Sequence, residues 1–290
     1  MAGLEYEQAS QLLSLAYETS GSVDGLPEGD TNRIKAYRRA YELAVDISSV
    51  PNLVVPGLKL ISAVSHKLFT EEDLISDDET EYWINVNTDA NLRLADIYLK
   101  LGNSAQFISG NNNALKNMDE LVKLYPEKKE ETHIRRDDMA KLTAEKARRV
   151  GENEIAIMYY MKAAVWAEEN DYDNPHSSVW AKRLFDHRMG AAMSAMEIGK
   201  EAPIAHSLSI AAKKGRKILA LAESEDERKE WDEKLFKLNV FIGDTFLSEG
   251  NNLSAFLAYK YAINSDYANY LSEDAVHSLL VKINRARDGR

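Results

Sequence analysis

The pattern of apolar and polar positions in residues 239–266 predicts two helices joined by a tight turn. Small and apolar residues fall on one face of a helix with about 3.6 residues per turn, on both sides of the turn: Ile242, Gly243, Phe246, Ala255, Tyr259 and Ala262. The turn is Gly250-Asn251-Asn252, residue types that end one helix and start the next. A glycine inside a helix costs about 1 kcal/mol relative to alanine. Gly243 therefore indicates a neighbouring helix that approaches too closely for a side chain.

Similar helical patterns flank three further glycines, at intervals of about 50 residues along the chain. The four glycines are Gly102, Gly151, Gly199 and Gly250. Recurrence at a fixed period predicts stacked supersecondary units, here pairs of antiparallel helices with a glycine at each corner. Around Gly102 the apolar pattern resumes only at Ala114, so about seven additional residues are predicted to separate this turn from its second helix.

Residues 239–266 resemble a tetratricopeptide repeat. The resemblance lies in the aliphatic-glycine pair, the turn glycine and the Ala-Tyr-Ala face described above, whereas Asn239 and Tyr267 stand where the family has tryptophan and proline. The resemblance implies an all-α fold, a right-handed α-α superhelix of stacked antiparallel hairpins with about 12 helices. A tetratricopeptide unit has about 34 residues, so units of about 50 residues imply a variant with longer helices.

The chain is predicted to form one continuous domain. Its parts are an atypical hairpin plus a short buried helix at 1–79, four hairpin units at 80–126, 127–175, 176–224 and 225–268, and a capping helix at 269–290. The first hairpin comprises a helix at 4–19 and another after Thr31, and the short helix spans Leu58–Phe69. Because the short helix has no polar face, we expect it to be buried and to plug the end of the stack. The acidic segment 71–81 is predicted to be a solvated linker whose last carboxylates begin the next helix, where the dipole favours negative charge.

Composition and charge narrow the classes of function. The 290 residues carry a formal net charge of -11, with the acids spread along the chain. This charge argues against a nucleic-acid-binding surface, because phosphate contacts need clustered Lys and Arg. The chain has no cysteine, which excludes disulfides, thiolate nucleophiles and cysteine-zinc sites. No window approaches about 18 uncharged apolar residues and no basic region precedes an apolar run, so we expect a cytoplasmic protein without a transmembrane segment.

The sequence has no arrangement of residues typical of catalysis, cofactor binding or metal binding. Glycine-rich phosphate loops, paired-histidine zinc spacings and GxSxG motifs are all absent. The segment Asp171–Pro175 resembles the start of a calcium loop but lacks the loop's glycine and its bidentate glutamate, so we expect a turn there. His187 and His206 lie in helical stretches and are interpreted as ordinary packed or surface residues. We therefore predict no enzymatic activity, no cofactor and no metal.

An acidic strip is predicted on the first helices of the four units. Two positions on each of these helices point away from the hairpin partner, toward what would be the concave surface of the stack. They are occupied by Asp89, Asp96, Asp138, Glu145, Asp186, Met193, Lys237 and Asp244. Most of these side chains are acidic, which favours a basic or amphipathic helical ligand. Alternatively, the carboxylates pair with bases of their own helices, at about 0.3 to 0.5 kcal/mol per pair, with Arg93 between Asp89 and Asp96 and Lys141 between Asp138 and Glu145.

Met189, Met193 and Met196 form a stripe at helical spacing next to this strip. We interpret the stripe either as filler in the core or as an adaptable apolar patch suited to an amphipathic helix. The leading functional hypothesis is a noncatalytic scaffold or adaptor that binds a basic or amphipathic helical peptide of a partner in its concave groove. Two alternatives stay open: a structural protein that self-assembles into homo-oligomers, and a regulator that senses a small molecule between its helices.

Overall fold

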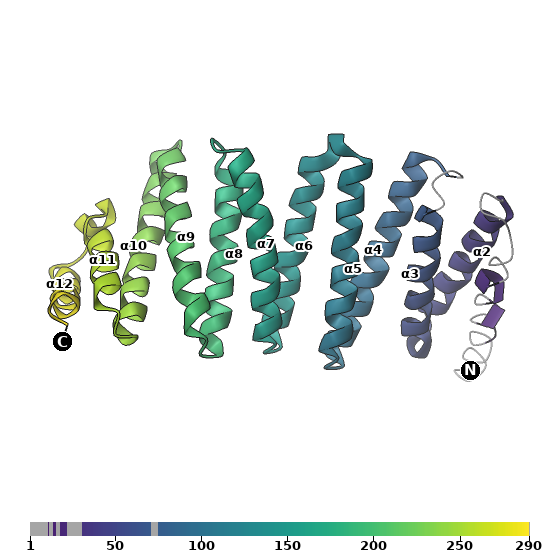
Figure 1. The fold of residues 1–290 in the computed structure, drawn as a ribbon, viewed down its shortest axis with the longest axis horizontal. Helices are drawn as coiled ribbons and strands as arrows, with labels where there is room; N and C mark the ends of the chain where they lie inside the picture. The colour runs from purple at the N-terminus through teal and green to yellow at the C-terminus, as the bar shows by residue number, and fades with distance from the viewer. Residues whose placement is uncertain (1–10, 12–13, 16–17, 22–30, 71–74, 290) are drawn as a thin grey trace. The chain divides into compact units, whose positions relative to one another are not determined.

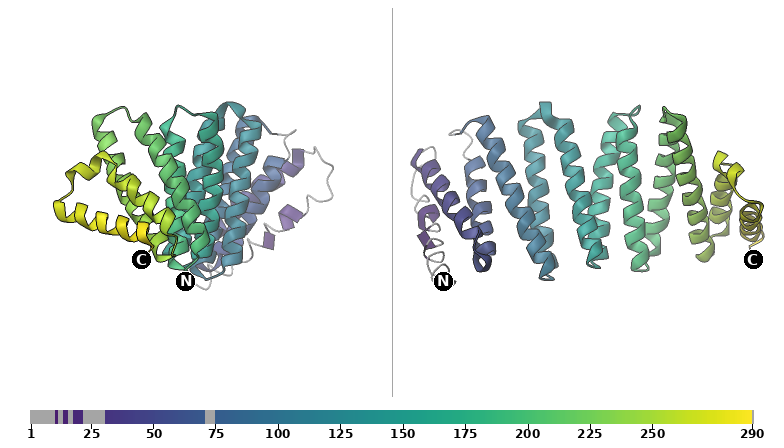
Figure 2. Two further views of the ribbon diagram at one scale, coloured as in Figure 1. Left: turned by 60° about the vertical axis from the view of Figure 1, so that its left-hand side comes forward. Right: turned by 180° about the vertical axis from the view of Figure 1, so that it is seen from behind.

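The computed structural model describes residues 11, 14–15, 18–21, 31–70 and 75–289, and every regular element in these ranges is a helix. The predicted all-α fold of stacked helices is therefore confirmed. The chain divides into two compact units, Met1–Met139 and Ala140–Arg290, with the boundary inside α6 (Lys129–Arg149). Within each unit, consecutive helices up to α11 run side by side in alternating directions, whereas the last helix crosses those before it (Figure 1, Figure 2). The predicted first helix at 4–19 lies largely outside the described residues.

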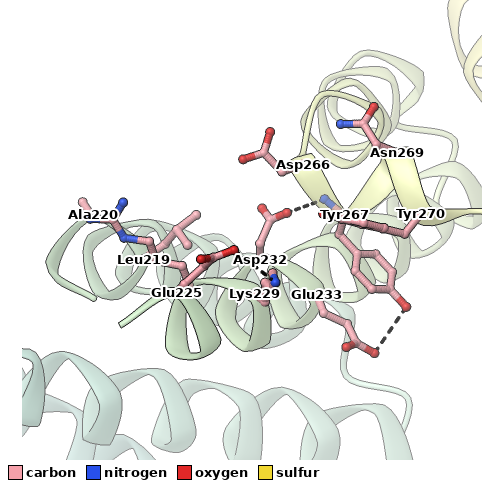
Figure 3. A pocket seen from close by; sticks show the side chains of 11 residues that line it. Leu219, Ala220, Glu225, Lys229, Asp232, Glu233, Asp266, Tyr267, Asn269 and Tyr270 are labelled. Carbon is pink, nitrogen blue, oxygen red and sulfur yellow. Dashed lines mark hydrogen bonds and ion pairs between the residues drawn. The ribbon is translucent and has the colours of Figure 1, made fainter. Parts of the chain in front are cut away.

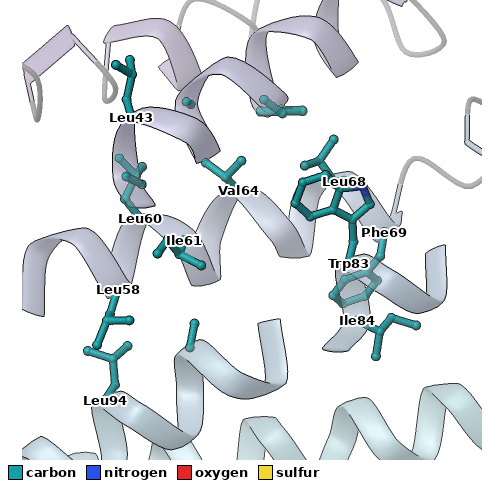
Figure 4. Packing of buried hydrophobic residues seen from close by; sticks show 14 of the residues in the cluster. Leu43, Leu58, Leu60, Ile61, Val64, Leu68, Phe69, Trp83, Ile84 and Leu94 are labelled. Atoms are coloured by element: carbon teal, nitrogen blue, oxygen red, sulfur yellow. The ribbon is translucent and has the colours of Figure 1, made fainter. Parts of the chain in front are cut away.

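From Thr31 on, the described residues of the first unit form four long helices, two short 3-10 turns and the beginning of α6. Its elements before α6 are α2 (Thr31–Ser48), η1 (Pro51–Leu53), α3 (Val54–Thr70), α4 (Asp77–Lys100), α5 (Ser104–Leu124) and η3 (Pro126–Lys128). Each long helix packs on the next along the chain, α2 on α3, α3 on α4 and α4 on α5. The core they share combines aliphatic residues such as Leu43, Leu60 and Val64 with the aromatic rings of Phe69 and Trp83 (Figure 4).

The expectation that Leu58–Phe69 plugs the end of the stack is wrong. This segment belongs to α3, which begins at Val54 and lies between α2 and α4 as a regular member of the stack. It also exposes a polar edge with Lys59, His66 and Lys67. The pattern misled because Pro56 was taken to break the helix, whereas proline is tolerated in the first turn, where a backbone N–H has no intrahelical acceptor.

The second unit contains the rest of α6 and six further α-helices. These are α7 (Asn153–Asp173), α8 (Ser178–Glu197), α9 (Glu201–Leu221), α10 (Glu225–Ser248), α11 (Asn252–Ile263) and α12 (Glu273–Asp288), with the 3-10 turn η4 (Asp266–Tyr270) before α12. One core cluster joins α8, α9 and α10, and another joins α11 to α12. Within the described ranges, no helix combines the length and hydropathy needed to cross a bilayer.

The four predicted glycine corners are equivalent in the structure. Gly102, Gly151, Gly199 and Gly250 lie between α4 and α5, α6 and α7, α8 and α9, and α10 and α11, with φ of 69°, 83°, 66° and 75°. At each corner the glycine N–H donates to the carbonyl three residues before it, and the next N–H donates to the carbonyl four residues before the glycine. This is the Schellman motif, whose left-handed residue is most easily a glycine. The prediction of homologous corners is therefore confirmed.

Side-chain caps at helix starts follow the sequence. Ser76 caps α4 and forms a capping box with Glu79, so the end of the acidic segment begins a helix as expected. Ser272 accepts a hydrogen bond from the Ala275 N–H at 3.3 Å, which confirms it as the N-cap of α12. Asn251 caps α11 in the same way, accepting from the Ser254 N–H at 3.2 Å.

The close approach inferred at Gly243 is confirmed. A Cβ atom at Gly243 would lie 2.4 Å from the ring of Tyr259, a fully buried side chain of α11. Gly190 of α8 repeats the arrangement, because a Cβ there would lie 2.5 Å from the ring of Tyr160 of α7. Each tyrosine therefore fills the space that a glycine on the partner helix leaves. The sequence pattern did not single out Gly190.

The expected gap between Gly102 and its second helix is wrong, because α5 begins at Ser104, directly after the corner. Gly110 and the asparagines that follow it are poor helix formers, and they hid the first half of this helix. Tertiary packing overrides that weak preference. A Cβ at Gly110 would lie 2.8 Å from the carbonyl oxygen of Asn91, so the glycine lets α5 approach α4 closely. Asn111 also donates to the Phe107 carbonyl at 2.8 Å, inside the helix.

Candidate functional site

Ion pairs join alternate helices of the stack, between residues about one repeat apart in the sequence. In the second unit, two pairs link α6 to α8: Lys141–Asp186 at 3.3 Å and Arg148–Glu197 at 2.7 Å. Lys182–Glu227 at 2.7 Å links α8 to α10, and Lys282–Asp244 at 2.7 Å links α12 to α10. The first unit has equivalent pairs at Arg38–Glu79, 2.6 Å, and Lys128–Glu81, 2.5 Å. Exposed pairs of this kind contribute about 0 to 1 kcal/mol each, so their main effect is to fix the register of the helices.

The predicted strip is divided between the two units. Asp89, Arg93, Asp96 and Asp138 belong to the first unit, where Asp89, Arg93 and Asp138 are exposed and Asp96 is half-buried. The other predicted residues belong to the second unit: Lys141, Glu145, Asp186, Met189, Met193, Met196, Lys237 and Asp244.

Several strip residues of the second unit are paired with bases. Asp186 pairs with Lys141 of α6, and Glu145 lies 4.0 Å from Arg149 of its own helix. Lys237 pairs with Glu233 at 2.5 Å within α10. The strip is therefore a mixed surface of carboxylates and bases.

Asp244 has a structural role that the sequence did not reveal. Its Oδ1 accepts hydrogen bonds from the Tyr259 hydroxyl at 2.6 Å and from Lys282 Nζ at 2.7 Å. These contacts tie α10 to α11 and α12. Burial, followed by the Asp244 carboxylate, raises the pKa of Tyr259, so the hydroxyl stays protonated and donates at neutral pH.

The surface between α6 and α8 carries the predicted methionines. The pairs Lys141–Asp186 and Arg148–Glu197 hold the two helices side by side. The helices are parallel, since the residue numbers increase in the same direction on both from one pair to the other. Along the sequence of these helices, Leu142 falls between Lys141 and Arg148 and is 48% exposed, and Met193 falls between Asp186 and Glu197 and is 42% exposed. Met196 is 41% exposed at the Arg148 end, and Met189 packs partly against the core. We call Leu142, Met189, Met193 and Met196 the apolar stripe.

A charged cavity of about 520 Å³ adjoins the Arg148–Glu197 end of this surface, lined by Glu145, Arg148, Arg149, Tyr160 and Glu197. The Arg148 guanidinium donates to Glu197 and holds the pKa of that carboxyl below its usual value. Burial and the nearby Glu145 raise the pKa of Tyr160, so its phenol is neutral at pH 7. The arrangement offers both donors and acceptors beside the apolar stripe.

A larger cavity of about 830 Å³ lies where α9, α10 and η4 meet (Figure 3). It exists because α11 has 12 residues whereas α10 has 24, so η4 covers the first half of α10 in place of a full second helix. Tyr267 closes one side, donating through its N–H to Asp232 at 2.5 Å and through its hydroxyl to Glu233 at 3.4 Å (Figure 3). Most carboxylates of this cavity are thus already engaged.

A polar cleft of about 520 Å³ in the first unit was missed by the sequence interpretation. It is lined by α3, α4 and α5, and its walls include Ser62, His66, Asn87, Asn91, Asn113 and Asn117. The signal was present, because on each helix two polar residues stand four apart and therefore share a face. It went unrecognised because residues 104–113 were not assigned to a helix.

The residues considered for metal binding and catalysis lie in helices: Asp171 and Asp173 in α7, His187 in α8 and His206 in α9. Asp171 and Asp173 end α7 and the turn follows them, so the expected turn begins later than Asp171. Asp171 is buried and pairs with Lys214 at 2.7 Å and Lys217 at 2.5 Å. Among the described residues, no group of three or more His, Cys, Asp or Glu side chains could hold a metal ion. His187 is buried in α8 and His206 is exposed on α9.

Comparison with solved structures finds helical repeat proteins. A designed circular tandem repeat protein with a novel repeat topology is 16% identical, with a TM-score of 0.41, over 99% of this chain and 73% of its own. A de novo designed helical repeat protein is 14% identical, with a TM-score of 0.19, over 99% of this chain and 100% of its own. A computationally designed self-assembling cyclic homo-oligomer is 16% identical, with a TM-score of 0.23, over 99% of this chain and 94% of its own. No protein-family model and no curated protein matches the sequence.

Proposed function

We propose that this protein is a noncatalytic scaffold that binds an amphipathic, basic helix of a partner protein on the surface formed by α6 and α8. The observation that carries the proposal is the apolar stripe, in which Leu142 and Met193 are nearly half exposed on two helices that two ion pairs join. Methionine side chains are flexible and adapt to the apolar face of many helices. Each methionine buried by a ligand would contribute apolar area, at about 25 cal/mol per Å².

Two carboxylates on the same surface can accept hydrogen bonds from a basic ligand. Asp186 and Glu197 border the apolar stripe and their side chains are 53% and 41% exposed, so each can accept a further hydrogen bond beside its existing partner. Lysines on the polar edge of a bound helix would meet these carboxylates. Such contacts favour fast association and correct orientation, and they weaken with salt.

The test uses a fluorescent helical peptide with leucines on one face and lysines on the other, bound to the full chain. Met193→Asp places a charge in the apolar stripe, and we expect it to weaken binding by at least about tenfold, which corresponds to about 1.4 kcal/mol. Fluorescence anisotropy measures the affinity. Val165→Asp is the matched control, because Val165 is 47% exposed on α7, outside the α6–α8 surface. Equal losses for the two variants, or equal binding of a leucine-glutamate peptide, would contradict the proposal.

Self-association is a second candidate function, favoured by one observation. Leu253, Leu257 and Tyr261 stand four apart on α11 and are 70%, 48% and 56% exposed, which makes a continuous apolar stripe on the last hairpin. Arg216 of α9 lies 5.0 Å from the Tyr261 ring and borders it. If a second copy covers this stripe, the wild-type chain should sediment as an oligomer and Leu257→Asp as a monomer. Monomeric sedimentation of the wild type at all concentrations would exclude this function.

A further inference from the structure

The polar cleft of the first unit is built from paired positions on three successive helices. Ser62 and His66 of α3, Asn87 and Asn91 of α4, and Asn113 and Asn117 of α5 line it. One turn before Asn113, Gly110 lets α5 approach the Asn91 carbonyl of α4 too closely for a side chain. The cleft volume of about 520 Å³ lies within the range of small-molecule sites.

A hydrogen-bond network fixes the amides at the floor of the cleft. Asn87 Nδ2 donates to the Ser62 carbonyl at 2.5 Å, and Asn87 Oδ1 accepts from Asn91 Nδ2 at 2.9 Å and from Asn117 Nδ2 at 2.8 Å. Asn117 Nδ2 also donates to the Thr88 hydroxyl at 3.1 Å. The amide groups therefore have defined orientations before any ligand binds, which lowers the entropy cost of binding.

The network leaves two acceptors for a ligand. Asn91 and Asn117 line the cleft and are 5% and 6% exposed. Their Nδ2 groups both donate to Asn87 Oδ1. None of the described residues donates to the Oδ1 atom of either. Both oxygens are open to the cleft, so a ligand hydroxyl can donate to them in place of solvent.

The rim of the cleft is close to neutral and offers both donors and acceptors. Lys116 and Glu120 carry opposite charges, and Glu120 already pairs with Lys123 at 2.7 Å. Burial, and to a lesser extent the charge of Lys67, lowers the pKa of His66, so this imidazole is neutral at pH 7 and can both donate and accept. Asn113, exposed on α5, contributes a complete amide. Phe69 and Leu124 provide apolar surface at the edge.

We propose that this cleft binds a neutral polyhydroxylated small molecule of the size of a mono- or disaccharide. Each hydroxyl of such a ligand can donate to an amide oxygen and accept from an amide N–H or an ammonium group. An anion would face the Asn91 and Asn117 oxygens, which repel negative charge. A cation would find a single carboxylate that is already paired. The proposal does not depend on partner binding at the α6–α8 surface.

The test titrates the full chain, labelled with ¹⁵N, with glucose, mannose, galactose, maltose and cellobiose, one at a time. At least one sugar is expected to shift the side-chain amide signals of Asn91, Asn113 and Asn117, with a dissociation constant near 1 mM or below, that is about -4 kcal/mol. Asn113→Trp should block the mouth of the cleft and weaken binding at least tenfold. Ser109→Trp is the matched control, one turn earlier on the exposed face of α5 and outside the cleft.

Binding that survives Ser109→Trp and is lost in Asn113→Trp supports the site. The proposal is overturned if none of the five sugars shifts these amides at concentrations of about 50 mM. It is also overturned if the shifts persist unchanged in Asn113→Trp, because the sugar then binds elsewhere. Circular dichroism of both variants shows that the helices remain folded, and the substituted positions are exposed, so neither change disturbs the network on the floor.

Discussion

Replacing Asp171 with alanine is expected to lower the free energy of unfolding of the second unit by about 3 kcal/mol. The carboxylate is 3% exposed and receives Lys214 at 2.7 Å and Lys217 at 2.5 Å, both from α9. Without it, two lysines whose side chains are only 16% and 25% exposed lose their counter-charge. Removal of one partner from a buried ion pair is costly for this reason, even where the pair itself contributes little net stability.

Glu154→Ala is the matched control for Asp171→Ala. Glu154 of α7 also pairs with a lysine, Lys200 at the N-cap of α9, at 2.6 Å, but the two side chains are 73% and 51% exposed. We expect no measurable change in the free energy of unfolding, because solvent screens exposed pairs. Urea unfolding of the full chain, followed by the fluorescence of Trp180 and Trp231, measures both variants. Similar losses for the two substitutions would contradict the assignment of Asp171 as a buried link between α7 and α9.

Gly243→Ala is expected to destabilise the second unit by about 1 to 3 kcal/mol. Alanine normally favours a helix over glycine by about 1 kcal/mol, so a loss requires a steric cause. That cause is the Tyr259 ring, 2.4 Å from the position of the new Cβ atom. The ring cannot move freely, since it is fully buried and its hydroxyl donates to Asp244 at 2.6 Å.

A double-mutant cycle separates this clash from other effects of the added methyl group. In a Tyr259→Leu background the ring is gone, and Gly243→Ala should then be neutral or stabilising by up to about 1 kcal/mol. Chemical denaturation of the four proteins measures the coupling. If alanine costs the same with and without the tyrosine ring, the pairing of a glycine on one helix with a tyrosine on the next does not explain the close packing.

The sequence predicts the corners of this fold because their cause is local. A left-handed residue at the end of a helix favours glycine whatever the rest of the chain does, so Gly102 and Gly250 can be recognised one at a time and then compared. Gly243 is also predictable, since an interior glycine costs stability unless packing requires it. These signals need no knowledge of which helices are neighbours.

Contacts between neighbouring helices cannot be predicted from one segment of the sequence at a time. The partner of Asp186 is Lys141, on the preceding first helix of the stack and far along the chain, so no search within a helix finds it. A search for opposite charges about one repeat apart would have found it. In the same way, Asn117 belongs to a cleft because α5 packs beside α4 and brings it to Asn87, a contact between helices that no single segment reveals.

The methyl groups of the methionines of α8 report directly on whether a helix binds to the α6–α8 surface. The full chain labelled with ¹³C at the methionine methyl groups should be titrated with the leucine-lysine peptide. We expect the signals of Met193, Met196 and Met189 to shift together and to saturate. Met118, fully buried in the first unit, should not move. The absence of any shift in the three α8 methionines, or shifts of the same size at Met118, would contradict a helix-binding surface on α6 and α8.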